Sequence, residues 1–160
     1  MKKIFPKTLS LIFLSIIVVN VQAQGLQAKK LGQIRPDSIT WQSFAAFPPE
    51  VRLAVLIGNP ITAGGYTVRV KVPAGVVLKP HRHPEDRIYT VISGVFYIGI
   101  GEKYDPAKLI AFAPGSVFVL PANTPHFHWA KSGEYVSQVS AIGPLGLEYV
   151  DPSDDPRKKK

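Results

Sequence analysis

The sequence predicts an all-β protein, built as an antiparallel sandwich or barrel. The chain of 160 residues contains 15 prolines and 13 glycines, which indicates many short elements separated by turns. Between Trp41 and Tyr149 it divides into short runs rich in β-branched and aromatic residues. No window of this region has the 3.6-residue apolar period of an amphipathic helix. Strands at this spacing, without helices between them, favour two packed antiparallel sheets or a closed barrel.

Nine runs are expected to be strands, each bounded by Gly, Pro, Asn or Asp. In chain order they are Arg52 to Ile57, Tyr66 to Val72, Val76 to Leu78, Ile88 to Ile92, Val95 to Ile100, Leu109 to Phe112, Val117 to Leu120, Phe127 to Trp129 and Tyr135 to Ile142. Asn59-Pro60, Pro73-Ala74-Gly75, Pro114-Gly115 and Pro121-Ala122-Asn123 are turn signals between them. The nearest candidate for helix is a single turn around Asp105 to Lys108.

Residues 1–23 have the order of a secretory signal peptide. Three lysines precede an apolar stretch at 9–19, and the small-residue pattern at 21–23 marks a cleavage site before Gln24. The stretch has about 11 residues, whereas a stable membrane anchor needs about 20. We therefore expect an exported protein, periplasmic or secreted, without a stable membrane span; an uncleaved anchor is the rival interpretation.

The rest of the chain is expected to form one domain. Residues 24–40 are a polar extension, 41–150 the β-barrel, and 151–160 a disordered basic tail. Without the three lysines of the leader, 16 basic residues stand against 11 acidic ones, a net charge of +5. Basic residues do not cluster with aromatic ones in the central region, so nucleic-acid binding is not expected. The chain has no cysteine, so any metal ligands must be nitrogen or oxygen atoms.

All four histidines fall into two pairs, His81 with His83 and His126 with His128. A spacing of two on an extended strand places both rings of a pair on the same face. Two such pairs on facing strands would aim up to four imidazoles into one cavity. Imidazole is the commonest side-chain ligand for Zn, Cu, Fe and Ni, so the pairs indicate a metal site.

The residues around these pairs resemble the two motifs of the cupin superfamily. Gly75-Val-Val-Leu-Lys-Pro-His81-Arg-His83-Pro-Glu-Asp-Arg87, followed by Gly94, resembles the first motif. Gly115-Ser-Val-Phe-Val-Leu-Pro121-Ala-Asn-Thr-Pro-His126 resembles the second. The resemblance implies a double-stranded β-helix, or jelly-roll barrel, of the small single-domain conserved-barrel type. It implies one divalent metal ion (Fe, Mn, Ni, Cu or Zn) inside, with His81, His83 and His126 on the three histidine-ligand positions.

The chain departs from the motifs in three places. Arg87 stands where the first motif has its acidic ligand, Asn123 replaces a glycine, and Ala130 replaces a final asparagine. The change to Asn123 is mild because asparagine also tolerates left-handed backbone. The change to Arg87 matters more, because a cation cannot ligate a metal.

Three interpretations of Arg87 remain open. Glu85 or Asp86 turns inward to supply the missing carboxylate, with Arg87 pairing to it from outside. Alternatively the site is a three-histidine set, with His128 as a fourth ligand, a group behind the ligands, or simply a polar residue at the barrel mouth. In the third interpretation the site holds no metal and Arg87 binds an anionic ligand, since its planar fork suits carboxylates.

Phe127 and Trp129, beside the histidines, are candidates for substrate contacts together with Arg87, although aromatic residues in strands more often pack the core. Two functions fit these observations. The first is a metal-dependent enzyme acting on a small organic molecule, with oxygenase-like or isomerase/lyase chemistry. The second is a non-catalytic module that binds or senses a small ligand or metal outside the cytoplasm. A homodimer is the expected oligomer, by analogy with cupin barrels.

Overall fold

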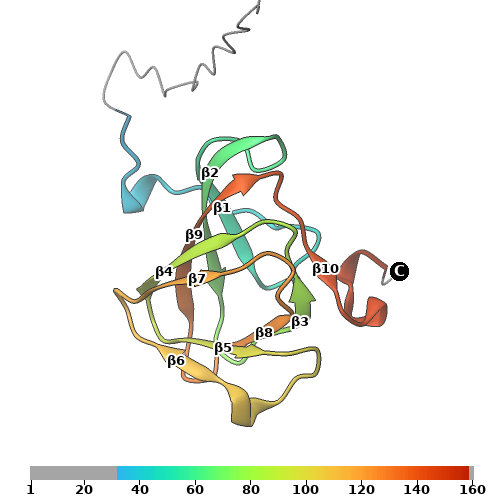
Figure 1. The fold of residues 1–160 in the computed structure, drawn as a ribbon. Helices are drawn as coiled ribbons and strands as arrows, with labels where there is room; N and C mark the ends of the chain where they lie inside the picture. The colour runs from blue at the N-terminus through green and yellow to red at the C-terminus, as the bar shows by residue number, and fades with distance from the viewer. Residues whose placement is uncertain (1–31, 159–160) are drawn as a thin grey trace, which may run out of the picture. The chain divides into compact units, whose positions relative to one another are not determined.

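A computed structural model describes residues 32–158, and the expected signal peptide lies outside them. Ten strands form two five-stranded antiparallel sheets (Figure 1). Sheet A has the strand order β1-β2-β9-β4-β7 and sheet B the order β10-β3-β8-β5-β6. The bounds are β1 Arg52–Ile57, β2 Gly64–Val72, β3 Val77–Arg82, β4 Arg87–Ser93, β5 Phe96–Ile100, β6 Ile110–Phe112, β7 Val117–Leu120, β8 His126–Trp129, β9 Tyr135–Gly143 and β10 Glu148–Tyr149. The all-β, jelly-roll prediction is confirmed.

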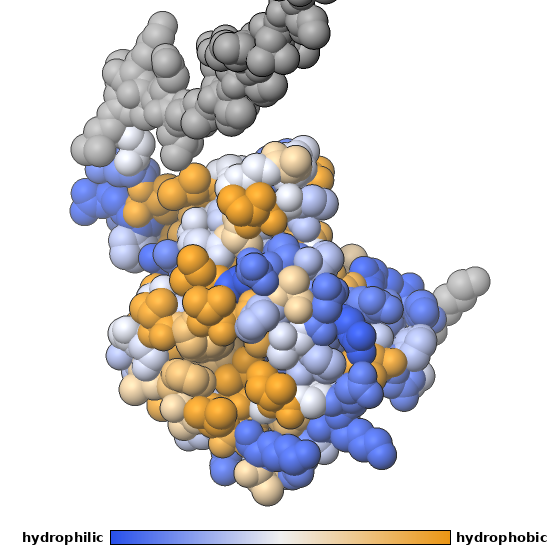
Figure 2. Space-filling model, in the orientation of Figure 1, coloured by the Kyte–Doolittle hydropathy of each residue, from blue (hydrophilic) through white to orange (hydrophobic). Residues whose placement is uncertain are grey.

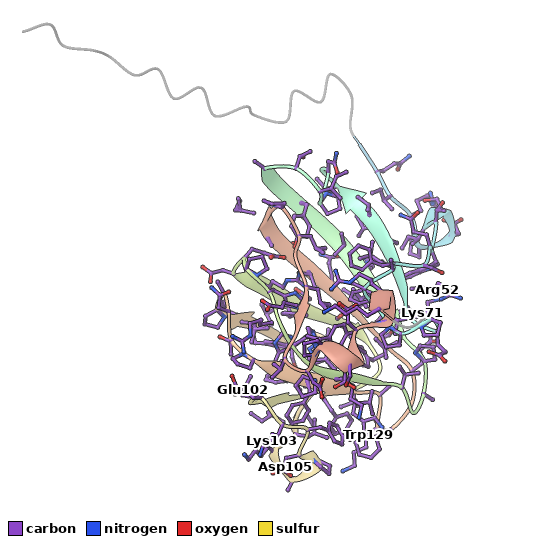
Figure 3. The ribbon with its side chains drawn as sticks, turned by 90° about the vertical axis from the view of Figure 1, so that its right-hand side faces the viewer. Arg52, Lys71, Glu102, Lys103, Asp105 and Trp129 are labelled. Carbon is purple, nitrogen blue, oxygen red and sulfur yellow. The ribbon has the colours of Figure 1, made fainter. Side chains whose placement is uncertain are left out.

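The core lies between the two sheets and follows from the period of two along each strand. In β2, Tyr66, Val68, Val70 and Val72 are buried, while the residues between them face outward. The side chains of both sheets fill the space between the ribbons (Figure 3). This close packing leaves the interior with little free volume.

Strand β3 is longer than expected and bends where the site lies. The prediction ended it at Leu78 because Pro80 follows, and proline lacks the N–H that a sheet requires. The pairing of β3 with β8 is irregular between Leu78 and His81, and an irregularity of this kind accommodates a proline. Pro80 still takes part in hydrogen bonding through its carbonyl, which accepts from Val150 N at 2.9 Å. The strand therefore continues through His81 to Arg82.

The C-terminal segment differs from the disordered tail that we expected. Residues 152–154 and 156–158 form two short 3-10 turns. The buried Asp155 accepts from Arg157 at 2.8 Å, and Arg157 also donates to the Leu147 carbonyl at 3.0 Å. Two further 3-10 turns lie at Pro36–Ser38 and Pro106–Lys108, and the second agrees with the single helical turn expected there. Within residues 32–158, no helix is long and apolar enough to cross a membrane.

Candidate metal centre

Three of the four histidines lie on β3 and β8, which are adjacent strands of sheet B. His81 pairs directly with His126 across the two strands, and His83 follows the end of β3. All four side chains are buried, with exposed fractions of 1% for His81, 3% for His83, 0% for His126 and 4% for His128. The period of two therefore turns both pairs toward the interior, as the spacing predicts.

Two of the rings are oriented by carbonyls that lie two residues earlier in the chain. His81 Nδ1 lies 2.7 Å from the Lys79 carbonyl oxygen, and His126 Nδ1 lies 2.9 Å from that of Thr124. A carbonyl can only accept, so each Nδ1 must carry the proton. The lone pair of each ring is then on Nε2, and that of His126 is buried without a hydrogen-bond partner among the described residues.

The third ring is oriented from a distant part of the chain. His83 Nδ1 donates to the Gly146 carbonyl oxygen at 2.6 Å, across 63 residues of sequence. Ligand nitrogens of His81, His83 and His126 all lie within 4.8 Å of one another. Metal-binding histidines characteristically donate their second N–H to a carbonyl or carboxylate in this way.

Burial keeps these imidazoles in the neutral form that a metal requires. It lowers the pKa of His81 well below the ordinary value of 6.5, and the neighbouring His126 lowers it further. Burial and then the charge of Arg87 do the same to the pKa of His83. Burial also lowers the pKa of His126 to about 4. At neutral pH all three Nε2 atoms are therefore available as ligands.

The arrangement fits a metal ion. Three neutral imidazoles converge, their tautomers are fixed by carbonyls, and one ring nitrogen is buried without a partner. Nitrogen donors without thiolate suit zinc, copper, iron and nickel. The three histidines could hold one such ion and would leave further coordination positions open, as catalytic sites require.

His128 lies beside the other three rings and contacts aromatic residues of the core. It packs against Phe96, with 4.7 Å between ring centroids, and its Nδ1 is 3.4 Å from the Tyr135 hydroxyl. It is not part of the cluster of candidate ligands formed by His81, His83 and His126. Its Nε2 is buried without a described partner, so the structure places it beside the centre rather than at the barrel mouth.

Arg87 and Glu85 form a buried ion pair. The Glu85 carboxylate accepts from Arg87 Nε at 3.0 Å and from Arg87 NH2 at 2.5 Å. It also accepts from the Tyr66 hydroxyl at 2.7 Å. The expectation that Arg87 pairs from outside is corrected, because its side chain is only 4% exposed and lines the interior beside His83. Glu85 is not part of the cluster of three histidines that could hold the metal.

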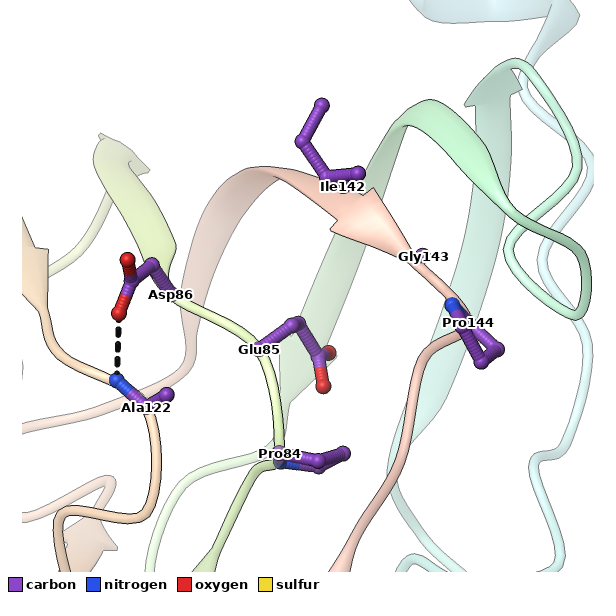
Figure 4. A pocket seen from close by; sticks show the side chains of 7 residues that line it. All are labelled: Pro84, Glu85, Asp86, Ala122, Ile142, Gly143 and Pro144. Carbon is purple, nitrogen blue, oxygen red and sulfur yellow. Dashed lines mark hydrogen bonds between the residues drawn. The ribbon is translucent and has the colours of Figure 1, made fainter.

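Asp86 points away from the histidines. Its carboxylate accepts from Ala122 N at 2.7 Å (Figure 4). Glu85 and Asp86 line an outer cleft of about 420 Å³ together with Ile142 and Pro144. The cavity inside the barrel, beside His81 and His83, measures only about 20 Å³. This is room for about one water, so the described conformation has no space there for an organic molecule.

Phe127 and Trp129 lie on the other face of sheet B. They alternate with His126 and His128 along β8, so their side chains leave the sheet on the opposite side. Phe127 packs against Tyr104 at 5.2 Å between ring centroids, and Lys131 lies 5.7 Å from the centre of the Trp129 ring. The structure does not bring these two aromatic residues to the imidazoles.

Sequence reasoning missed Gly146 and Tyr66, which contact the site from other strands. Gly146 follows β9 and Tyr66 belongs to β2. A glycine and a tyrosine at these distances carry no local pattern, so only the folded arrangement reveals their contacts.

The fold and the three buried histidines place this protein in a class, that of small β-barrel proteins with a candidate site for one metal ion. The family model of the ChrR cupin-like domain matches residues 29–106, which include His81 and His83. This match covers just under half of the chain, and the fold is the cupin jelly roll that the motifs predict. No curated protein matches the sequence.

Solved structures of other proteins share the fold. The polyketide cyclase RemF from Streptomyces resistomycificus is 16% identical, with a TM-score of 0.65 over 81% of this chain and 92% of RemF. KdgF from Halomonas sp. is 24% identical, with a TM-score of 0.53 over 68% of this chain and 93% of KdgF. The DMSP lyase DddQ from Ruegeria pomeroyi DSS-3 is 18% identical, with a TM-score of 0.57 over 70% of this chain and 61% of DddQ. At these identities the likeness establishes the fold alone.

Proposed function

We propose that this protein is a metal-dependent enzyme that acts on a small organic molecule. One observation carries the proposal: three buried imidazoles converge, and each is oriented by a carbonyl at Nδ1, which leaves Nε2 for a metal. His81, His83 and His126 would hold the metal. A divalent ion there would supply Lewis-acid chemistry at an open coordination position. The names of two structural neighbours, a cyclase and a lyase, support lyase-type over oxygenase-like chemistry.

The protein's own groups would orient and protect the reacting molecule. The cavity wall combines apolar side chains, among them Val70 and Leu78, with polar groups that include Arg87, Tyr89 and Ser137 beside the histidines. The small volume of the cavity keeps bulk water away from the site. Since the inner cavity is as small as one water, a substrate would have to enter through a movement of the segments between it and the outer cleft.

A second candidate function is a non-catalytic metal-binding or metal-sensing module. The observation that favours it is the same small cavity, which has too little room for an organic substrate. Proton relaxation of water around bound Mn²⁺ distinguishes the two candidates. Rapid exchange of a bound water supports the enzyme, and a centre without exchangeable water supports the binding module.

The first experiment measures metal content. The chain from Gln24 is purified without chelator or affinity tag and analysed by mass spectrometry for iron, manganese, nickel, copper and zinc. We expect about one ion per chain, lost in the His81→Ala/His83→Ala double variant. The His128→Asn variant is the matched control, because it removes a buried histidine outside the cluster and should retain the metal. A wild-type chain that takes up none of the five metals after reconstitution overturns the proposal.

Export and self-association are also proposals. Residues 1–23 support export to the periplasm or beyond, and a mature protein that begins at Gln24 is the expected product. The outer face of sheet A supports a homodimer, because its β4–β7 half is apolar and uncharged among the described residues. A small molecule remains the proposed ligand.

A further inference from the structure

Gly146 is the point where the candidate ligand His83 meets the buried ion pair. Its carbonyl oxygen accepts from His83 Nδ1 at 2.6 Å and from Arg87 NH2 at 3.3 Å. Its N–H donates to Glu85 Oε2 at 3.3 Å. Both backbone polar groups of this one residue after β9 therefore bond to the charged pair, and its carbonyl also orients a ring of the candidate centre.

The ion pair that holds this peptide is itself rigidly held. Arg87 and Glu85 have side chains that are 4% and 8% exposed, and Tyr66 donates to the same carboxylate. A buried pair of this kind costs desolvation and often adds little net stability. The pair lies between the candidate ligand His83 and the segment that contains Gly146, so its role is to hold these two parts of the chain in a fixed arrangement.

The approach of Gly146 to the site requires glycine. A Cβ atom at this position would lie 2.6 Å from Pro84 Cγ and 2.7 Å from Pro84 Cδ, and Pro84 is covalently next to His83. Neighbouring peptides are tied as well: Leu145 N donates to the Pro60 carbonyl at 2.6 Å. The segment is therefore seated directly on the residue that follows the ligand.

The three rings differ in what orients them. His81 and His126 use carbonyls only two residues earlier in the chain. His83 depends on a carbonyl 63 residues away. The orientation of His83 is therefore the one that requires the tertiary structure around Arg87.

We propose that Arg87 is a positioning residue. Together with Glu85 it clamps the backbone N–H and carbonyl of Gly146, and the clamped carbonyl holds the His83 ring in the orientation that metal binding requires. The arginine that replaces the expected acidic ligand serves the metal site through His83, neither as a ligand nor as a substrate anchor. This inference rests on the proposed function, because it requires that the three histidines bind metal.

The first test compares metal affinities of four chains: wild type, Arg87→Lys, Glu85→Gln and Glu102→Gln. Lysine keeps the positive charge but has one nitrogen in place of the guanidinium, which contacts Glu85 through both Nε and Nη2, and Glu85→Gln removes the negative charge of the pair. Loss of a group that orients a metal-ligating histidine weakens binding about 10–100-fold, and we expect this for both clamp variants with Co²⁺. Glu102→Gln is the matched control: it removes the ion pair with Arg82, next to His81 and His83 on the outside, and should change affinity less than about 2-fold. Equal affinity in all four chains overturns the inference.

The second test asks whether Arg87 acts through His83. A double-mutant cycle compares Arg87→Lys in the wild-type and His83→Ala backgrounds, with Co²⁺ affinity and the visible Co²⁺ spectrum as readouts. We expect Arg87→Lys to weaken binding and alter the spectrum only where His83 is present. The same fold-loss in both backgrounds would show that Arg87 acts on the whole fold, which overturns the inference.

Gly146→Ala keeps the test informative if the charge variants fail to fold, because it displaces the clamped peptide and removes no charge. We expect about the same loss of Co²⁺ affinity as in Arg87→Lys, with apoprotein circular dichroism unchanged. Unaltered affinity in this variant counts against the clamp. Wild-type chain that binds no metal would instead overturn the proposed function, so the two failures are distinguishable.

Discussion

At the scale of single residues, the pKa of His126 links stability to pH. In the unfolded chain this imidazole titrates near 6.5, whereas burial lowers its folded pKa to about 4. Between these values the unfolded state binds a proton and the folded state does not. The free energy of unfolding of the apoprotein therefore falls as the pH is lowered from 6.5 toward 4. His81, His83 and His128 act in the same direction.

We therefore expect the Tm of the apoprotein to fall steadily between pH 7 and pH 5 in calorimetry. The His126→Asn variant, which has one buried imidazole fewer, should show a shallower decline over the same interval. A Tm that stays level from pH 7 to pH 5 would contradict the buried, neutral state of the histidines.

Arg87 provides a second prediction at this scale. Arg87→Glu places a carboxylate where the first cupin motif has its acidic ligand, but beside the buried Glu85. Breaking a buried ion pair costs about 3–5 kcal/mol, so the apoprotein should lose that much stability. Metal should restore more stability in this variant than in wild type, because it neutralises the added charge. Denaturant titrations with and without Zn²⁺ measure both; an apoprotein as stable as wild type would refute the prediction.

At the scale of elements, the pairing of β5 with β8 depends on a small residue. Gly99 lies directly opposite Phe127, and a Cβ atom on Gly99 would come within 2.2 Å of the ring. Gly99→Ala should therefore destabilise the fold by about 1–3 kcal/mol, the usual cost of overpacking. Phe127→Leu in the same chain should restore part of the loss, and urea denaturation of the single and double variants measures it. If the two substitutions lower the free energy of unfolding additively, the added methyl group at position 99 and the Phe127 ring do not clash, and the prediction is wrong.

The strands show what sequence could predict at this scale. Alternating runs bounded by turn residues predict all nine longer strands, and β1 and β7 have the expected bounds. Strand β10 has two residues, too few to carry a period, and it forms by pairing with β3. The tail was misjudged because Asp155 and Arg157 are tied by contacts that composition does not reveal. Asn123 has a φ of 59°, which agrees with its replacing a glycine.

The part of the site that depends on residues close together in sequence was predictable. The spacing of two within each histidine pair predicts that both rings lie on the same face, and the motifs predict the three histidines that the structure brings together. The clamp was not predictable, because it joins residues from β2, β4 and the segment after β9. Phe127 and Trp129 were placed at the site by proximity in sequence, although alternation along β8 sends them to the other face.

At the scale of the whole molecule, the outer face of sheet A has two unlike halves. Its β1–β2 half carries Arg52, Arg69 and Lys71, and the first and last of these pair directly across the strands (Figure 3). Its β4–β7 half carries Ile88, Val117 and Val119, which are 49%, 62% and 63% exposed. Apolar residues gather over this part of the surface in Figure 2. Contiguous exposed apolar surface commonly marks an interface.

A second copy of the chain is the partner that this face fits. The protein carries a net positive charge, so two copies repel through their basic regions, whereas the β4–β7 half has no charge to oppose contact. Strand β7 is also an edge strand of sheet A, where another strand could pair. A two-fold axis here would bring the two apolar halves together.

We therefore expect the chain from Gln24 to sediment as a dimer in analytical ultracentrifugation. The Val117→Lys/Val119→Lys variant should sediment as a monomer, because it places two charges on this edge strand and on the apolar half. Lys71→Gln, on the cationic half of the same face, is the matched control and should leave the dimer intact. Metal content should be the same in all three chains, since the face lies outside the histidine cavity. A wild-type chain that sediments as a monomer, or a dimer that survives the double substitution, would show that this face has no role in self-association.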